Sequence, residues 1–405
     1  MKLPDTFLSL RHICFSKTAF TVFNDPDVRH FWSTQDIHSC IWSSEEIESL
    51  LGKEAATLLN DAQEHKILSK EMKPTLSHEY KHRFTGDGKH HSLPNKQWEI
   101  LVDQKLSALS LPNMFKKEVM ALVRLIVIEY FKWLQDHKPI IMSTTNLEDH
   151  FHWTQDNKID RQKSAKAIIA DVSIDIRDRF MLASHYCFQE YVLSIWEILD
   201  DARQSFFQEC DFDMARMWAN WARNGAELDW EEIARKSGGD GFGLQTLFLK
   251  LEQEKRLQHL MRYRRGIWIN YHELQFCLSI LDQKEQNEIL RKCPFQILEL
   301  FLDWPVQEKL LDAVELLWPY LSEPDFCDFL YLILSQKRML NLITSDYVAL
   351  VKKFWKRVPF EFCKFLENDA IFNTLRIPRL FYYKEGYIEH RCKITIKTTS
   401  SAQFK

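Results

Sequence analysis

The clearest hydrophobic pattern in the chain lies in residues 171–199. Apolar residues recur there at the three- and four-residue spacing of a helix, and the pattern breaks at 185–189. Its apolar members are Phe180, Ala183, Cys187, Val192, Ile195, Trp196 and Leu199. The segment therefore predicts two short helices joined by a bend. Because such a pair cannot bury both of its faces alone, it needs neighbouring helices of the same kind.

The same periodicity predicts helices at 7–23, 98–109 and 114–135, with Pro112 in the first turn of the last. We divide the chain into an N-terminal helical region at 1–135, which includes a polar, His-rich loop at 61–97, and a helical hairpin array at 161–375. A short extended or disordered tail follows at 376–405. The Gly-rich stretch 237–243 is read as a loop or hinge within the array.

Glycine is scarce in this sequence. The 405 residues include only 10 Gly and 12 Pro, whereas 45% are hydrophobic. An all-β protein with many tight turns would need more glycine. The expected fold is therefore all-α, with stacked helical hairpins that form an irregular α-solenoid-like array.

A short pattern suggests that the array is repetitive. Valine is followed four residues later by tryptophan, with Ile, Leu or Phe just before it, at 192–196, 314–318 and 351–355. The valine and the residue before the tryptophan share one helix face. We therefore expect Trp196, Trp318 and Trp355 to be buried between adjacent helices.

Four stretches of the chain resemble large arthropod families of uncharacterised all-α proteins, for which no activity is known. They are NKIDRQKSAKAII at 157–169, RFMLASHYCFQEYVLSIW at 179–196, MWANWARNGAELDWEEIA at 217–234 and LDWPVQEKLLDAVELLWPYL at 302–321. The resemblance implies a helical fold and assigns no residue a role. Residues 179–199 also resemble an ankyrin helix pair, although the ankyrin turn signature Thr-Pro-Leu-His is absent.

Charge and cysteine usage restrict the expected binding partners and the expected cellular location. The formal net charge of −4 gives no general attraction to nucleic acid or to an anionic membrane. The most apolar run, 119–134, contains three charged residues, so we expect no membrane insertion. Nine cysteines lie singly along the chain, which favours reduced, buried thiols and a cytoplasmic or otherwise intracellular location for a soluble protein.

One stretch matches a metalloprotease pattern. His78, Glu79 and His82 form a literal HExxH, in which the two histidines of a helix could hold zinc and the glutamate could act on a bound water. Lys81 places a positive charge inside the motif, and Thr85 replaces the glycine of its longer form. A solvated, His-rich loop is the interpretation that we favour, so no metal or cofactor is expected.

A second candidate site is basic. Arg256, Arg262, Arg264 and Arg265 lie close together in the sequence, with aromatic residues among them. Arginine and aromatic side chains together can bind RNA or acidic peptides. Acidic neighbours favour a solvated helix face, and binding of nucleic acid is not the expected role.

The function that we expect from the sequence is that of a protein-interaction scaffold without catalytic activity. Its partners would be other proteins. A zinc-dependent hydrolase using the stretch 78–82 and a nucleic-acid-binding array using 255–265 are the two alternatives.

Overall fold

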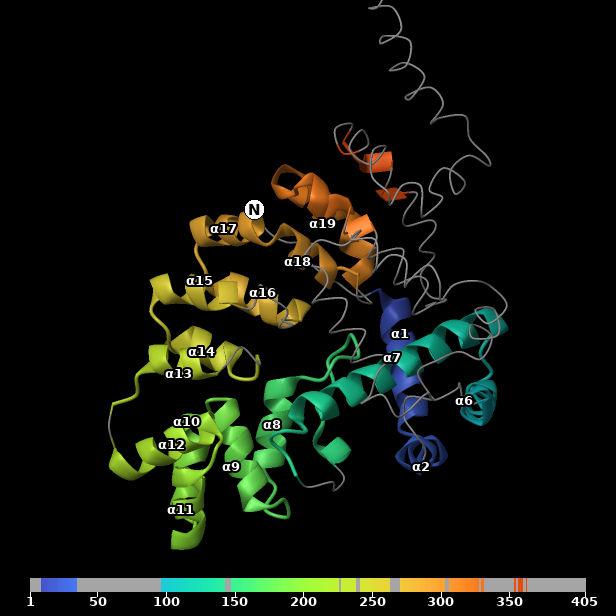
Figure 1. Ribbon diagram of the computed structural model, residues 1–405. Helices are drawn as coiled ribbons and strands as arrows, with labels where there is room; N and C mark the ends of the chain where they lie inside the picture. The colour runs from blue at the N-terminus through green and yellow to red at the C-terminus, as the bar shows by residue number, and fades with distance from the viewer. Residues whose placement is uncertain are drawn as a thin grey trace, which may run out of the picture.

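The computed structural model describes residues 9–34, 96–142, 147–225, 227–237, 241–262, 270–302, 306–327, 329–330, 353–354, 356–359 and 362. Within these ranges the fold is all-α, as predicted, and contains no strand. The helices follow one another around a curved path, and the long helix α7 crosses α1 (Figure 1). Residues 61–95 of the His-rich loop and the tail at 376–405 lie outside the described residues.

The α-helices are α1 (Leu10–Phe23), α2 (Pro26–Thr34), α6 (Lys96–Ala108), α7 (Asn113–His137), α8 (Arg161–Ala170), α9 (Ile176–His185), α10 (Gln189–Trp196), α11 (Asp201–Glu209), α12 (Asp213–Asn224), α13 (Trp230–Lys236), α14 (Leu244–Lys250), α15 (Gln253–Arg262), α16 (Tyr271–Ile280), α17 (Gln283–Lys292), α18 (Pro294–Leu300) and α19 (Leu310–Leu317). Short 3₁₀ helices are η2 (Leu147–His150), η4 (Val306–Lys309) and η5 (Trp318–Tyr320). The helices predicted at 7–23, 98–109 and 114–135 are confirmed within a few residues.

The predicted bend at 185–189 is also confirmed. Helix α9 ends at His185, Cys187 has a positive φ of 57°, and α10 begins at Gln189. The backbone N–H of Phe188 donates to the carbonyl of Ala183 at 2.9 Å, which closes the end of α9. The two helices pack against each other.

One glycine of the Gly-rich stretch fits closely against this bend. A Cβ atom on Gly243 would lie 2.8 Å from the Sγ of Cys187 and 3.1 Å from the carbonyl oxygen of His185. Only glycine allows the backbone to approach this closely. The glycine therefore brings the start of α14 onto the α9–α10 pair.

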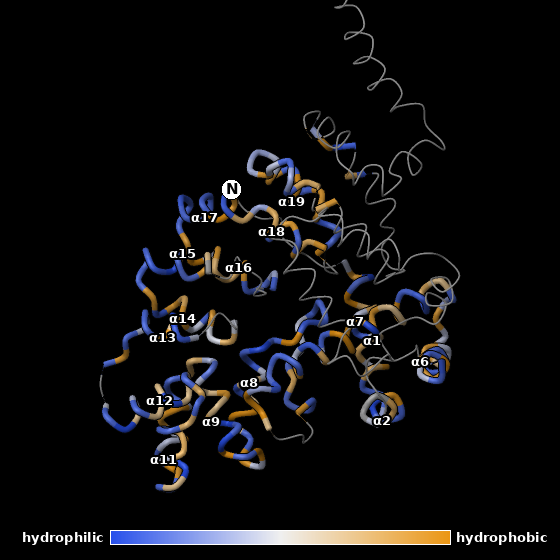
Figure 2. Tube along the Cα trace, viewed as in Figure 1, coloured by the Kyte–Doolittle hydropathy of each residue, from blue (hydrophilic) through white to orange (hydrophobic). Residues whose placement is uncertain are grey.

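The buried apolar residues form two hydrophobic clusters, which we call the first unit (15–251) and the second unit (244–358). They meet at α14, where Leu247 and Leu251 belong to the first unit and Leu244 and Phe248 to the second. Because all four side chains are buried, α14 is a shared wall between the two cores. Hydrophobic and hydrophilic positions alternate along the helices (Figure 2).

The same joint connects consecutive helices at several places. Leu251, Leu281 and Leu321 each follow the last residue of a helix. Their backbone is extended, with φ of −75°, −74° and −75°. Each of the three is buried. The residue after each leucine opens the next helix, most clearly Asp282, whose side chain accepts from the N–H of Glu285 at 2.8 Å. A buried leucine followed by a helix cap is therefore a recurring element of the fold.

A side chain of the following helix ties this joint together. Five residues after Leu281, the Nε2 of Gln286 donates to the carbonyl of Leu281 at 3.0 Å. Gln204 makes the same bond to Leu199 at 3.3 Å, and the Nε of Arg256 donates to Leu251 at 3.0 Å. The five-residue spacing is the same at these three places, and the tryptophan pattern did not predict it.

The three tryptophans of that pattern have different outcomes. Trp196 is 6% exposed and contacts Phe180 with 6.1 Å between ring centroids, so its predicted burial is confirmed. Trp318 is half-buried against Phe326 and Phe354, and its Nε1 has no hydrogen-bond partner within the described residues. Trp355 lies outside the described residues.

Among the helices that the structure describes, none has the length and apolar character needed to cross a bilayer. The apolar run 119–134 lies in α7, whose buried residues include the acidic Glu129.

Candidate functional site

The metalloprotease-like stretch is not among the described residues. His78, Glu79 and His82 all lie outside them. Within the described part of the chain, no group of three or more His, Cys, Asp or Glu side chains is arranged to hold a metal ion. The zinc hypothesis therefore stays a prediction.

The basic cluster is only partly described. Arg256 is half-buried and donates to the carbonyl of Leu251, so its role is to tie the joint before α15. The neighbouring Lys255 pairs with Glu231 of α13 at 3.0 Å. The side chain of Arg262 and all of Arg264 and Arg265 lie outside the described residues. The two described basic side chains thus contact the protein's own backbone and carboxylate.

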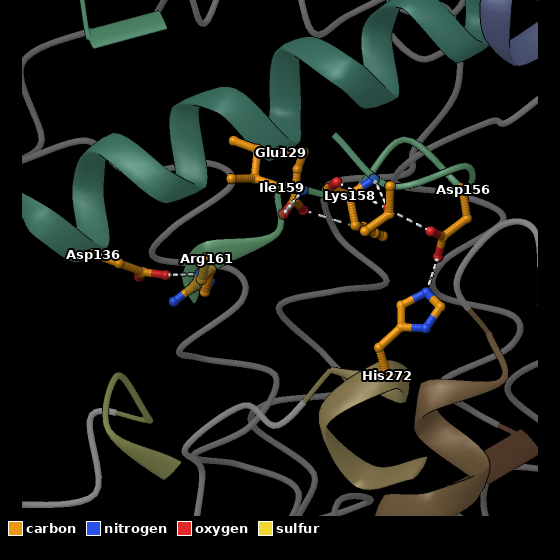
Figure 3. A network of polar contacts seen from close by, with 8 residues as sticks. Glu129, Asp136, Asp156, Lys158, Ile159, Arg161 and His272 are labelled. Carbon is orange, nitrogen blue, oxygen red and sulfur yellow. Dashed lines mark hydrogen bonds and ion pairs between the residues drawn. The ribbon is translucent and has the colours of Figure 1, made fainter. Parts of the chain in front are cut away.

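The structure brings a different set of charged side chains together, between α7, the turn at 153–160, the start of α8 and the start of α16 (Figure 3). Asp136 of α7 pairs with Arg161, whose side chain is 16% exposed. Glu129 lies two turns before Asp136 on α7. It accepts from the backbone N–H of Ile159 at 3.3 Å and pairs with Lys158 at 3.7 Å. We call this set the charged network.

Local structure explains the position of the turn. Thr154 accepts from the N–H of Lys158 at 3.1 Å, and its hydroxyl lies 2.5 Å from the carboxylate of Asp156. Asn157 has a positive φ of 58°, a conformation that asparagine tolerates well. Asp160 then caps α8 by accepting from the N–H of Lys163 at 3.0 Å. The turn thereby holds Asp156 toward α16.

His272 of α16 completes this side of the network. Its Nε2 lies 2.7 Å from the carboxylate of Asp156, which is almost fully buried. The hydrogen bond with Asp156 raises the pKa of His272, against the opposing effect of burial. Burial acts to raise the pKa of Asp156, but His272 and Thr154 outweigh it and the pKa lies below its ordinary value.

Burial also affects the pKa values of Arg161 and of the nearby Glu273. It is outweighed at Arg161 and prevails at Glu273. It disfavours the charge of Arg161, but Asp136 outweighs this effect and the pKa of the guanidinium is raised. Burial raises the pKa of Glu273, although Arg161 acts in the other direction. Glu273 also accepts from the N–H of Asn270 at 3.0 Å, in a capping box at the start of α16. The Glu273 carboxylate thus caps its own helix and interacts electrostatically with Arg161 of the network.

A buried histidine lies at the end of α7. The Nδ1 of His137 lies 2.7 Å from the carbonyl of Trp133, and its Nε2 lies 2.8 Å from the hydroxyl of Tyr186. The carbonyl can only accept, so Nδ1 carries the proton and Nε2 accepts from the tyrosine. Burial, with a smaller effect of Arg161, lowers the pKa of His137 to about 3. The ring is therefore neutral and joins α7 to the α9–α10 bend.

The chemistry of these groups favours holding elements together over catalysis. Each described carboxylate of the network binds a cation, a histidine or a backbone N–H. Cys277, one turn after Glu273, is fully buried, and burial together with Glu273 raises the pKa of its thiol. A neutral thiol is a poor nucleophile.

We expect Cys277 to react with a thiol reagent about a hundredfold or more slowly than the exposed Cys14 in the native protein, because it must wait for local opening. Mass spectrometry of peptides after timed alkylation measures both rates in one sample. Labelling of Cys277 at the rate of Cys14 would contradict its burial. Addition of denaturant should equalise the two rates.

Sequence reasoning missed the charged network. Asp156 and His272 lie 116 residues apart, and neither belongs to a spaced motif. The turn at 153–160 falls in a segment that reads only as a polar connection. The helix cap at Asp160 was the one available signal that α8 begins there.

No family model, no curated protein and no solved structure matches this chain. The resemblances to arthropod helical families and to an ankyrin helix pair therefore stay predictions.

Proposed function

We propose that this protein is a protein-interaction scaffold built from packed helical hairpins in an irregular α-solenoid-like array. The observation that supports the proposal is the recurring joint at Leu199, Leu251 and Leu281, where the side chain five residues later donates to the leucine carbonyl. Stacked repeats of short helices expose long surfaces, and such surfaces typically bind other proteins.

One corner of the first unit exposes apolar side chains suited to such binding. Leu109 and Met114 lie on either side of the α6–α7 turn and are 46% and 65% exposed. Leu10, 77% exposed, precedes Arg11, whose guanidinium pairs with Glu118 near the start of α7 at 2.6 Å. We call Leu10, Leu109 and Met114 the apolar corner. Exposed apolar clusters are frequent sites of protein association.

The test is quantitative affinity purification of the full chain with mass spectrometry. A triple variant, Leu10→Gln, Leu109→Gln and Met114→Gln, removes the apolar corner. A matched control, Val172→Gln with Leu249→Gln, changes apolar residues that are 83% and 58% exposed elsewhere. Because all five side chains are exposed, each change should alter stability by about 0.5 kcal/mol or less.

We expect the triple variant to lose about five- to thirtyfold in the amount of the specific partner recovered, as for the removal of central interface residues, and the control to retain it. Equal recovery by the triple variant and the control would place binding elsewhere on the protein. Failure of the wild-type chain to enrich any protein over an unrelated bait would contradict the scaffold function itself. Metal analysis of the same sample tests the zinc alternative.

A further inference from the structure

The two hydrophobic units touch through polar contacts as well as through α14. The ion pairs that join described residues of the two units include His272 with Asp156, His12 with Glu308, and Lys255 with Glu231. The last pair lies between neighbouring elements of the chain, next to α14. The other two lie far from α14 in sequence and close the units onto each other at separate places.

Both of the distant pairs use a histidine. The Nε2 of His272 lies 2.7 Å from Asp156, and the Nε2 of His12 at the start of α1 lies 3.2 Å from Glu308 of η4. Histidine is the side chain whose charge changes near neutral pH. Apolar packing does not respond to pH in this way, so the shared wall at α14 persists while the His272–Asp156 contact changes.

The surroundings of His272 favour its charged form. Asp156 and Lys158 face it from the turn at 153–160, with opposite effects, and Glu273 adds a negative charge from its own helix. Behind Lys158 lies Glu129 of α7, which partly compensates that lysine. The nearest strong contact is the carboxylate of Asp156, and it dominates this set.

We propose that the two units are closed by a histidine latch at His272–Asp156, with the His12–Glu308 pair as a second contact, and that deprotonation of His272 lets the second unit move away from the first about α14. The folded-state pKa of His272 is raised, so the latch is complete below the ordinary histidine pKa and weakens as pH rises through the higher value. It also weakens in strong acid, where Asp156 is protonated.

Amide hydrogen exchange at pH 6 and pH 8, corrected for intrinsic rates, tests the latch. The peptides of interest cover 153–160, 270–277 and 306–314, and a peptide from α9 (176–185) reports on the interior of the first unit. Because His272 is 43% exposed and solvent screens its pair, we expect the opening equilibrium of the three latch peptides to rise only about threefold from pH 6 to pH 8. The α9 peptide should not change.

The variant His272→Gln should show the more open behaviour at both pH values. Glu231→Gln is the matched control, because it breaks a pair that joins the units without a histidine and should keep the pH dependence. The proposal is overturned if the wild type shows no change between the two pH values, or if His272→Gln retains that change. A shift in α9 as large as in the latch peptides would indicate global destabilisation and would also overturn it.

Discussion

Replacing Trp196 by alanine should destabilise the fold by about 3–5 kcal/mol. The indole is 6% exposed and packs in the first unit beside Phe180. Removing this buried ring takes away its packing contacts and leaves a cavity in the core. Chemical denaturation followed by circular dichroism measures the change in unfolding free energy.

Trp318→Ala is the comparison for this measurement. Its side chain is half-buried between aromatic rings, and its Nε1 lacks a hydrogen-bond partner within the described residues. We therefore expect a smaller loss of about 1–3 kcal/mol. A loss below about 1 kcal/mol for Trp196→Ala, combined with weaker capture of a partner, would move Trp196 from the core to a binding surface.

The second large effect concerns pH. The pKa of His137 is about 3 in the folded protein, against an ordinary value of 6.5. Between these values the unfolded chain binds a proton that the folded protein does not. Stability is therefore fully present above about pH 6.5 and falls by about 1.4 kcal/mol for each pH unit below it. At pH 4.5 the loss from this residue should reach about 2–3 kcal/mol.

Two other histidines help to assign this effect. The pKa of His185 is also lowered by burial, so it adds to the loss in acid. His272 has a raised pKa, so its contribution is present in mild acid and is lost as the pH rises. Urea denaturation between pH 4.5 and 8 measures the sum of these contributions.

His137→Gln isolates the contribution of the buried histidine. Glutamine keeps hydrogen-bonding groups near Tyr186 but does not titrate, so the variant should show a clearly shallower fall in stability below pH 6.5. It should also be less stable than the wild type at pH 7, because the stacked contact with Trp133 at 3.8 Å is lost. An unchanged slope in acid would show that His137 is not the group responsible.

Local sequence signals determined the helices. Periodic apolar residues predicted α1, α6, α7 and the α9–α10 pair, because helical contacts join residues three or four apart. Caps mark several starts, as when Ser9 accepts from His12 and Asp200 accepts from Arg203. Glycine scarcity excluded a turn-rich β fold, and the bend at 185–189 follows from the break in the pattern. These features need no knowledge of distant residues.

Some sequence interpretations stay predictions. The boundaries at 1–135 and 161–375, the intracellular location and the protein partners are not tested by the structure. The clusters show only that two cores meet at α14, where its two faces belong to different units.

Tertiary structure alone decided how the helices combine. The close approach of Gly243 to Cys187 depends on a contact between segments 56 residues apart (243 − 187). Asp156 meets His272 across 116 residues, and Arg256 ties a joint rather than joining an open basic face. Such pairings depend on which helix faces pack together, and many packings satisfy the same helical periodicity. The short-range pattern specifies a helix and its apolar side, but only the assembled fold specifies which side chain that face will meet.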